Sequence, residues 1–188
     1  MRAFIMTHRV RNLAPFIAMI LMLWGCSEHS HGPDGHDHDV VSRVEVSLVG
    51  LLSADTTTYV WEDADGAGGN NPNRIDTIVL EVGKTYVGSL RLLNSTVSPV
   101  EDLTSGVRDD MDQHQFFFTI TDSLATITIQ DYDDRSLPVG LSIGLVGRKA
   151  GTGSLGIELS HFDDPTQKTG VNRSDETDVS VTFPLVVR

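Results

Sequence analysis

Cysteine is nearly absent from this sequence, and aromatic and cationic side chains are scarce. The 188 residues include one Cys, 6% aromatics, and 14 Lys and Arg against 26 Asp and Glu. A single Cys excludes an internal disulfide and a cysteine-based zinc cluster. The formal charge of −12 at pH 7 argues against nucleic acid as a partner, because attraction to phosphates needs clustered Lys and Arg.

A hydrophobic run long enough to span a membrane is also missing near the N-terminus. The apolar run from Leu13 to Trp24 covers about 12 residues, whereas a spanning helix needs about 20. Arg2, Arg9 and Arg11 precede it and give the segment a basic start. We therefore interpret residues 1–25 as a signal peptide.

The only Cys follows this run directly. The segment Leu23-Trp24-Gly25-Cys26 resembles the lipobox of bacterial lipoproteins, although Trp24 is larger than the usual residue at its position. The resemblance implies cleavage before Cys26 and lipidation of that residue, which would attach the chain to a membrane through acyl chains. By analogy, Ser27 and Glu28 favour the outer membrane and leave its periplasmic or cell-surface face open. The alternative is an ordinary secretory signal followed by a free thiol.

Residues 26–39 contain no large apolar side chain, which predicts a flexible tether after the lipidated cysteine. Histidines alternate with acidic residues along it. Imidazole and carboxylate groups are ligands for zinc, copper and nickel. The metal-ligand candidates in this tether are His29, His31, His36, His38, Asp37 and Asp39. The alternative is a hydrophilic spacer without a metal.

From Val40 onward, apolar and polar residues alternate with a period of two, as in half-buried strands. Gly, Asn and Asp residues separate the stretches, as tight turns require. Residues 40–188 are therefore predicted to form an all-β domain, an antiparallel immunoglobulin-like or Greek-key β-sandwich of about 8–9 strands. The nine candidate strands include residues 44–48, 59–61, 78–82, 86–92, 116–120, 125–129, 141–145, 155–159 and 179–183.

The segment from Ser98 to Gln113 is too long for a hairpin and too polar for a central strand. We expect an ordered excursion over one end of the sandwich, and no convincing helix anywhere in the domain.

Motifs of common catalytic sites are missing, so we predict that the protein is not an enzyme. Residues 151–156 match the GxGxxG pattern, but they lead into a strand, whereas phosphate binding requires the start of a helix. We interpret them as a turn. The sequence has no GxSxG, Walker or HExxH motif.

Two acidic loops resemble calcium sites, because they place oxygen ligands at alternate positions. The first contains Asp63, Asp65 and Asn70, and the second contains Asp131, Asp133 and Asp134. Neither completes an EF-hand. Solvated carboxylates in turns are the alternative.

Two histidines lie at expected strand ends. His114 shares a strand face with Phe116, and His161 shares one with Leu159. Asp112 and Asp163 have the same parity, so these two histidines and two aspartates would converge on one metal if the strand ends adjoin. Hydrogen-bonded histidines without a metal are the alternative.

Four segments, residues 101–120, 131–141, 151–162 and 176–187, resemble small lipoproteins of Bacteroidota, as does the lipobox. The segments include HQFFF, PVGL, LSHF and ETDVSVTFP. The resemblance implies a lipid anchor, a β-sandwich and an association with nutrient uptake through TonB-dependent receptors of the outer membrane. It implies no catalytic residue.

The sequence thus predicts a cell-envelope lipoprotein that binds a divalent transition metal, zinc first, with an outer-membrane receptor as a partner. One alternative is a structural or adhesive lipoprotein, braced by calcium, that binds glycan or a partner protein. Another is an accessory subunit of a receptor for a different nutrient. The oligomeric state stays open.

Overall fold

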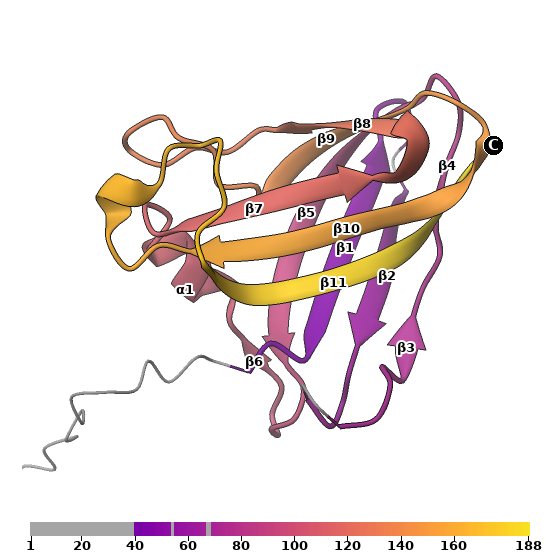
Figure 1. Cartoon of the computed structure of the whole chain (residues 1–188). Coiled ribbons are helices and arrows are strands. Elements are labelled where there is room, and N and C mark those ends of the chain that lie inside the picture. The colour runs from indigo at the N-terminus through magenta and orange to yellow at the C-terminus, as the bar shows by residue number, and fades with distance from the viewer. Residues whose placement is uncertain (1–39, 54, 67–68) are drawn as a thin grey trace, which may run out of the picture. The chain divides into compact units, whose positions relative to one another are not determined.

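The computed structural model describes residues 40–53, 55–66 and 69–188 (Figure 1). The predictions for the signal peptide, the lipidated Cys26 and the tether lie outside these residues. The same holds for the tether's metal-ligand candidates, His29, His31, His36, His38, Asp37 and Asp39. Among the described residues, no helix is long and apolar enough to cross a membrane.

Eleven strands of the described chain form two sheets. The larger sheet has the order β3-β2-β1-β5-β9-β8, with β6 also paired to β5, and the smaller has the order β4-β11-β10-β7. The strands are β1 (Arg43–Gly50), β2 (Thr56–Glu62), β3 (Arg74–Ile75), β4 (Ile78–Leu80), β5 (Thr85–Asn94), β6 (Glu101–Asp102), β7 (His114–Ile120), β8 (Ala125–Ile129), β9 (Ser142–Gly147), β10 (Gly151–His161) and β11 (Glu176–Val187). Their pairing is antiparallel except between β4 and β11. The predicted all-β sandwich is confirmed.

All nine strands expected from the alternation are present, but the predicted number of strands was too low. The two additional strands are β3 and β6, which contain two residues each. Two residues are too few to show a period, so such strands leave no alternation in the sequence.

The core lies between the two sheets and contains the apolar side of the longer strands, whereas both residues of β3 and of β6 are exposed. Alternate residues of β11, from Val179 to Val187, are buried, and so are Val44, Val46 and Leu48 of β1. Burying one such side chain contributes about 1.5–3 kcal/mol. Strand β10 lies inside the smaller sheet and pairs with β7 on one side and with β11 on the other.

The excursion before β7 contains a short helix, α1 (Thr104–Asp109), so the expectation of a domain without helices was wrong here. Leu103 and Val107 are buried and belong to the core. The hydroxyl of Thr104 accepts a hydrogen bond from the backbone N–H of Leu92 (3.0 Å) and ties the helix to β5. Six residues hold too few apolar positions for helical periodicity to be recognised.

Three further segments complete the local structure. Single-turn 3-10 helices cover Thr121–Ser123 and Pro165–Gln167. Residues 151–156, expected in a turn, instead lie within β10. This placement agrees with the rejection of a phosphate loop, because no helix follows.

Gly140 packs against the core in a backbone conformation that favours glycine. Its φ is +103°, and an added Cβ would lie 2.7 Å from the Cβ of Phe116. Gly140→Ala should lower the free energy of unfolding by about 1–3 kcal/mol, measured by urea denaturation. Gly83 has a φ of +76° but nothing within 4 Å of an added Cβ, so Gly83→Ala measures the backbone strain alone. Equal losses in the two variants would contradict a steric contribution from Phe116.

Candidate metal centre

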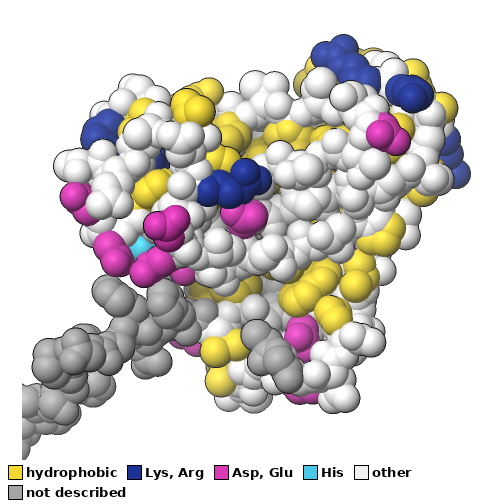
Figure 2. All heavy atoms as spheres, viewed as in Figure 1, with side chains coloured by type: hydrophobic (Ala, Val, Ile, Leu, Met, Phe, Trp, Pro, Cys, Tyr) yellow, Lys and Arg dark blue, Asp and Glu magenta, His cyan; other side chains and the backbone are white. Residues whose placement is uncertain are grey.

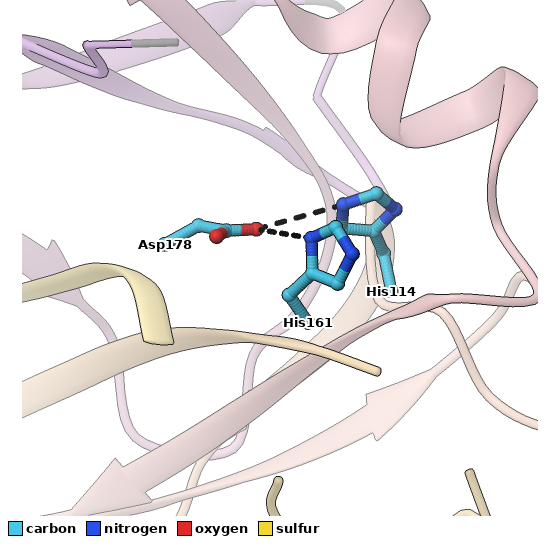
Figure 3. A group of neighbouring side chains, drawn as sticks. All are labelled: His114, His161 and Asp178. Atoms are coloured by element: carbon cyan, nitrogen blue, oxygen red, sulfur yellow. Dashed lines mark ion pairs between the residues drawn. The ribbon is translucent and has the colours of Figure 1, made fainter. Parts of the chain in front are cut away.

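Two histidines and one aspartate meet at one end of the smaller sheet. His114 is the first residue of β7, His161 is the last residue of β10, and the two are direct partners in the register. Asp178 lies near the start of the adjacent strand β11. One ligand atom from each residue lies within 4.8 Å of the other two. Figure 3 shows both imidazole rings directed toward the Asp178 carboxylate.

The distances from Asp178 to the two histidines are close to those between two ligands of one metal ion. The Asp178 Oδ2 atom lies 3.5 Å from Nε2 of His114 and 3.5 Å from Nδ1 of His161. Zinc bonds of about 2.0–2.2 Å in tetrahedral geometry separate two ligand atoms by about 3.4 Å. The ring centroids of the two histidines are 4.8 Å apart at an angle of 69°, so the rings meet edge to face.

The hydrogen bond of His114 to the backbone determines which of its two ring nitrogens carries the proton. The other ring nitrogen faces Asp178. Nδ1 lies 2.8 Å from the backbone carbonyl oxygen of Asp110, which only accepts hydrogen bonds, so Nδ1 donates and carries the proton. In the neutral ring, Nε2 then presents a lone pair toward an anionic oxygen. Two such acceptors require a proton or a metal ion between them. The separation of 3.5 Å exceeds the usual 2.7–3.2 Å of a hydrogen bond and suits a metal ion.

His161 has a second carboxylate behind it. Its Nε2 lies 3.8 Å from Oδ1 of Asp163, while its Nδ1 faces Asp178. A carboxylate on the outer nitrogen of a metal-binding histidine orients the ring and increases its basicity. Asp163, predicted as a direct ligand, therefore lies where an outer partner of His161 would lie.

Asp112, the other predicted ligand, is not a member of this group. Residues 110–113 form a turn before β7, so the alternation that placed Asp112 beside His114 does not extend to it. The backbone carbonyl of Asp112 accepts a hydrogen bond from Nη2 of Arg135 (3.0 Å). The histidine pair predicted from parity is present, whereas its predicted partner Asp112 is replaced by Asp178.

A β-bulge explains why the sequence did not indicate Asp178. Leu159 pairs with Val179 and Ser160 pairs with Thr177, so Asp178 is the extra residue on β11. Strict alternation would place Asp178 on the face opposite Val179. A bulge inserts one residue and redirects side chains, which brings Asp178 toward the histidines.

The group is partly shielded from solvent but accessible. The side chains of His114, His161 and Asp178 are 11%, 18% and 16% exposed. Figure 2 shows a histidine side chain at the surface among Asp and Glu side chains. The surrounding negative charge attracts cations, and a tetrahedral ion held by these three side chains would keep a fourth position for water.

The predicted calcium cluster of Asp131, Asp133 and Asp134 is not supported by the contacts of its carboxylates. The two Asp131 oxygens accept the backbone N–H groups of Gly140 (2.9 Å) and Leu141 (3.0 Å). Asp133 accepts two further backbone N–H groups, and the Lys168 ammonium lies 3.0 Å from its Oδ2. A bound cation would be repelled by this ammonium, and Asp134 is exposed.

The contacts of Asp133 belong to a network that holds the loops near the candidate metal site. Lys168 Nζ donates to the Met111 carbonyl (2.7 Å) as well as to Asp133. Arg135 donates to the carbonyl oxygens of Asp112 (3.0 Å) and Pro165 (2.7 Å). The turn that supplies the Asp110 carbonyl to His114 is therefore fixed by two cations, one of them buried.

The other predicted calcium cluster is assembled in part. Asp65 Oδ2 accepts from the backbone N–H of Asn70 (3.0 Å) and from its side-chain Nδ2 (2.7 Å). Asn70 thus donates hydrogen bonds to Asp65. As a calcium ligand, Asn70 would instead have to direct its side-chain oxygen toward the ion. Asp63 is buried beside them.

A scan against models of protein families and a search of curated proteins found no match for this chain. The resemblance to small lipoproteins of Bacteroidota therefore stays a prediction.

Proposed function

We propose that this protein is a lipid-anchored protein of the bacterial outer membrane that binds one divalent transition metal ion, zinc first, at His114, His161 and Asp178. The observation that carries the metal site is the convergence of two imidazole nitrogens on one carboxylate oxygen at 3.5 Å. The lipid anchor rests on the resemblance of residues 23–26 to a lipobox.

The donor set favours zinc. Two nitrogens and one carboxylate oxygen suit a borderline ion with tetrahedral preference, whereas calcium prefers six to eight oxygens. Copper binds such ligands more tightly than zinc in the general affinity order, so the ion bound in the cell depends also on supply. The spacing of 3.5 Å between Asp178 and each imidazole nitrogen is close to that of two ligands in tetrahedral zinc, which supports zinc among these ions.

The protein's role is to capture the ion and pass it to an outer-membrane receptor. A fourth position open to water allows an incoming ligand to replace the metal-bound water and draw the ion away. The His-rich tether collects ions near the folded site, because its imidazoles raise the local metal concentration. No catalytic step is part of this proposal.

Isothermal titration calorimetry with zinc tests the site. We expect the full-length chain, purified in detergent, to bind one equivalent at submicromolar affinity, beside weaker binding by the tether. Removal of residues 30–39 should abolish the weaker binding and keep the tight equivalent. His114→Ala combined with His161→Ala should abolish the tight equivalent, because both imidazole ligands are lost.

Circular dichroism of each variant confirms that the sandwich is folded. Loss of tight binding only in the shortened chain would assign the metal to the tether and contradict the folded site. An unchanged tight equivalent in the double variant would contradict it as well.

A further inference from the structure

Two acidic residues, Asp63 and Asp65, follow the end of β2 and lie far in sequence from the histidine site. Asp63 follows Glu62, the last residue of β2, and its backbone N–H donates to the carbonyl of Ser42 (2.8 Å). Its own carbonyl accepts from the N–H of Gly66 (3.1 Å). The backbone of Asp63 is thus fixed on both sides, and its carboxylate has a defined place beside Asp65.

The Asp63 carboxylate is buried and incompletely satisfied. Asp63 is 6% exposed, and its Oδ1 atom has no hydrogen-bond partner. A buried carboxylate oxygen without a donor is costly, because it loses its hydration and gains nothing in return. The described part of the chain supplies no Lys or Arg that pairs with Asp63 or Asp65.

Asp65 is close enough to Asp63 for their carboxyl groups to share a hydrogen bond. Burial raises the pKa of Asp63, and the neighbouring Asp65 raises it further. Hydrogen bonds from the backbone and side chain of Asn70 lower the pKa of Asp65, so Asp65 is the member of the pair that holds its negative charge. Either a proton on Asp63 or a cation bound between the two carboxyl groups would therefore relieve their repulsion.

We propose that Asp63 and Asp65 bind a hard divalent cation, calcium, through the unpartnered Asp63 Oδ1 and a carboxylate oxygen of Asp65. Both ligands are oxygens two residues apart, and Asp65 is exposed, so waters complete the coordination shell. Magnesium fits less well, because it demands octahedral geometry at shorter distances. This site is independent of the proposed zinc site.

Bound calcium would stiffen the region where β1 begins and β2 ends. Asp63 is joined to Ser42, directly before β1, by the backbone hydrogen bond. Calcium neutralises the repulsion between the two carboxylates, so it stabilises the folded chain by mass action. With two protein carboxylates as ligands, we expect a Kd of about 0.1–1 mM, as in extracellular calcium modules.

The test is calcium titration of the full-length chain in detergent, followed by calorimetry and thermal unfolding. The His114→Ala, His161→Ala double variant serves as the background, so that the zinc site cannot contribute. We expect calcium to raise Tm, and Asp63→Asn to lower calcium affinity by at least about 10-fold, because one charged ligand is lost. The asparagine amide can donate to Asp65, so this variant should fold.

Asp134→Asn is the matched control, because it also removes one aspartate charge. Asp134 is exposed and belongs to the other acidic loop, whose contacts do not support a calcium site. It should keep the calcium response of the background chain. The proposal is overturned if calcium leaves Tm unchanged, or if Asp63→Asn and Asp134→Asn respond alike. Neither result affects zinc binding, which is measured on the chain with both histidines. Failure of the calcium proposal is therefore distinguishable from failure of the zinc proposal.

Discussion

Lys168→Met is expected to lower the free energy of unfolding by about 3–5 kcal/mol, because the buried Asp133 carboxylate loses its buried cationic partner and keeps only the half-exposed Arg135, at 3.5 Å. The side chains of Lys168 and Asp133 are both 0% exposed, and their charged atoms are 3.0 Å apart. Methionine has similar volume but cannot donate to Asp133 or to the Met111 carbonyl. For a chain of this size, we expect Tm to fall by about 6–20 °C.

The matched control is Arg173→Met. Arg173 forms an ion pair with Glu158 at 2.7 Å, but the two side chains are 46% and 28% exposed. Such surface pairs contribute about 0–1 kcal/mol. Urea unfolding of both variants measures the difference, and equal losses would show that burial does not determine the contribution of Lys168.

The buried pair also predicts a loss of stability in acid. Burial alone would raise the pKa of Asp133, but hydrogen bonds from Leu137 N–H and Lys168 lower it below its ordinary value. Burial lowers the pKa of Lys168, and the attraction of Asp133 opposes that shift. A carboxyl group with a lowered folded-state pKa contributes stability above its unfolded pKa of about 4, and this contribution is lost as the pH falls through the folded-state pKa. The free energy of unfolding should therefore decrease below about pH 4, and less steeply in Lys168→Met.

The same contacts connect the stability of the fold to the candidate metal site. Lys168 holds the Met111 carbonyl, and the neighbouring Asp110 carbonyl fixes Nδ1 of His114. Displacement of this turn would free the His114 ring to rotate away from Asp178. The buried ion pair thus helps to position His114, a residue that it does not contact.

The alternation of apolar residues predicted the strands well because each long strand buries one face. Parity also showed that His114 and His161 continue the buried faces of their strands to the strand ends, whereas the pairing of those ends came only from the structure. The short strands β3 and β6 and the helix α1 were missed because each contains too few residues for a period.

Asp178, the third residue of the candidate metal site, could not be predicted from parity. The bulge at Asp178 depends on how β10 and β11 pair, which is a property of two strands and not of either sequence alone. Similarly, the contrast between the two acidic clusters depends on Lys168, which lies far along the chain from Asp133.

Asp178→Asn is expected to weaken zinc binding by more than about 100-fold, because loss of an outer partner already costs about 10–100-fold and Asp178 supplies the anionic ligand itself. The amide is nearly the same size as the carboxylate, so the bulge should be kept. Zinc calorimetry of the chain lacking residues 30–39 measures the effect without binding by the tether.

Asp112→Asn and Asp163→Asn complete the comparison, because each removes one aspartate charge close to the same histidines. Asp112→Asn should leave zinc affinity unchanged, since the contact of Asp112 with Arg135 uses its backbone carbonyl. Asp163→Asn should weaken binding about 10-fold, the lower end for an outer partner, because its side chain is 55% exposed. If all three variants lost affinity equally, general negative charge would explain the attraction of zinc. A loss concentrated at Asp178 requires direct coordination, because the nearby aspartates contribute the same charge without facing both imidazole rings.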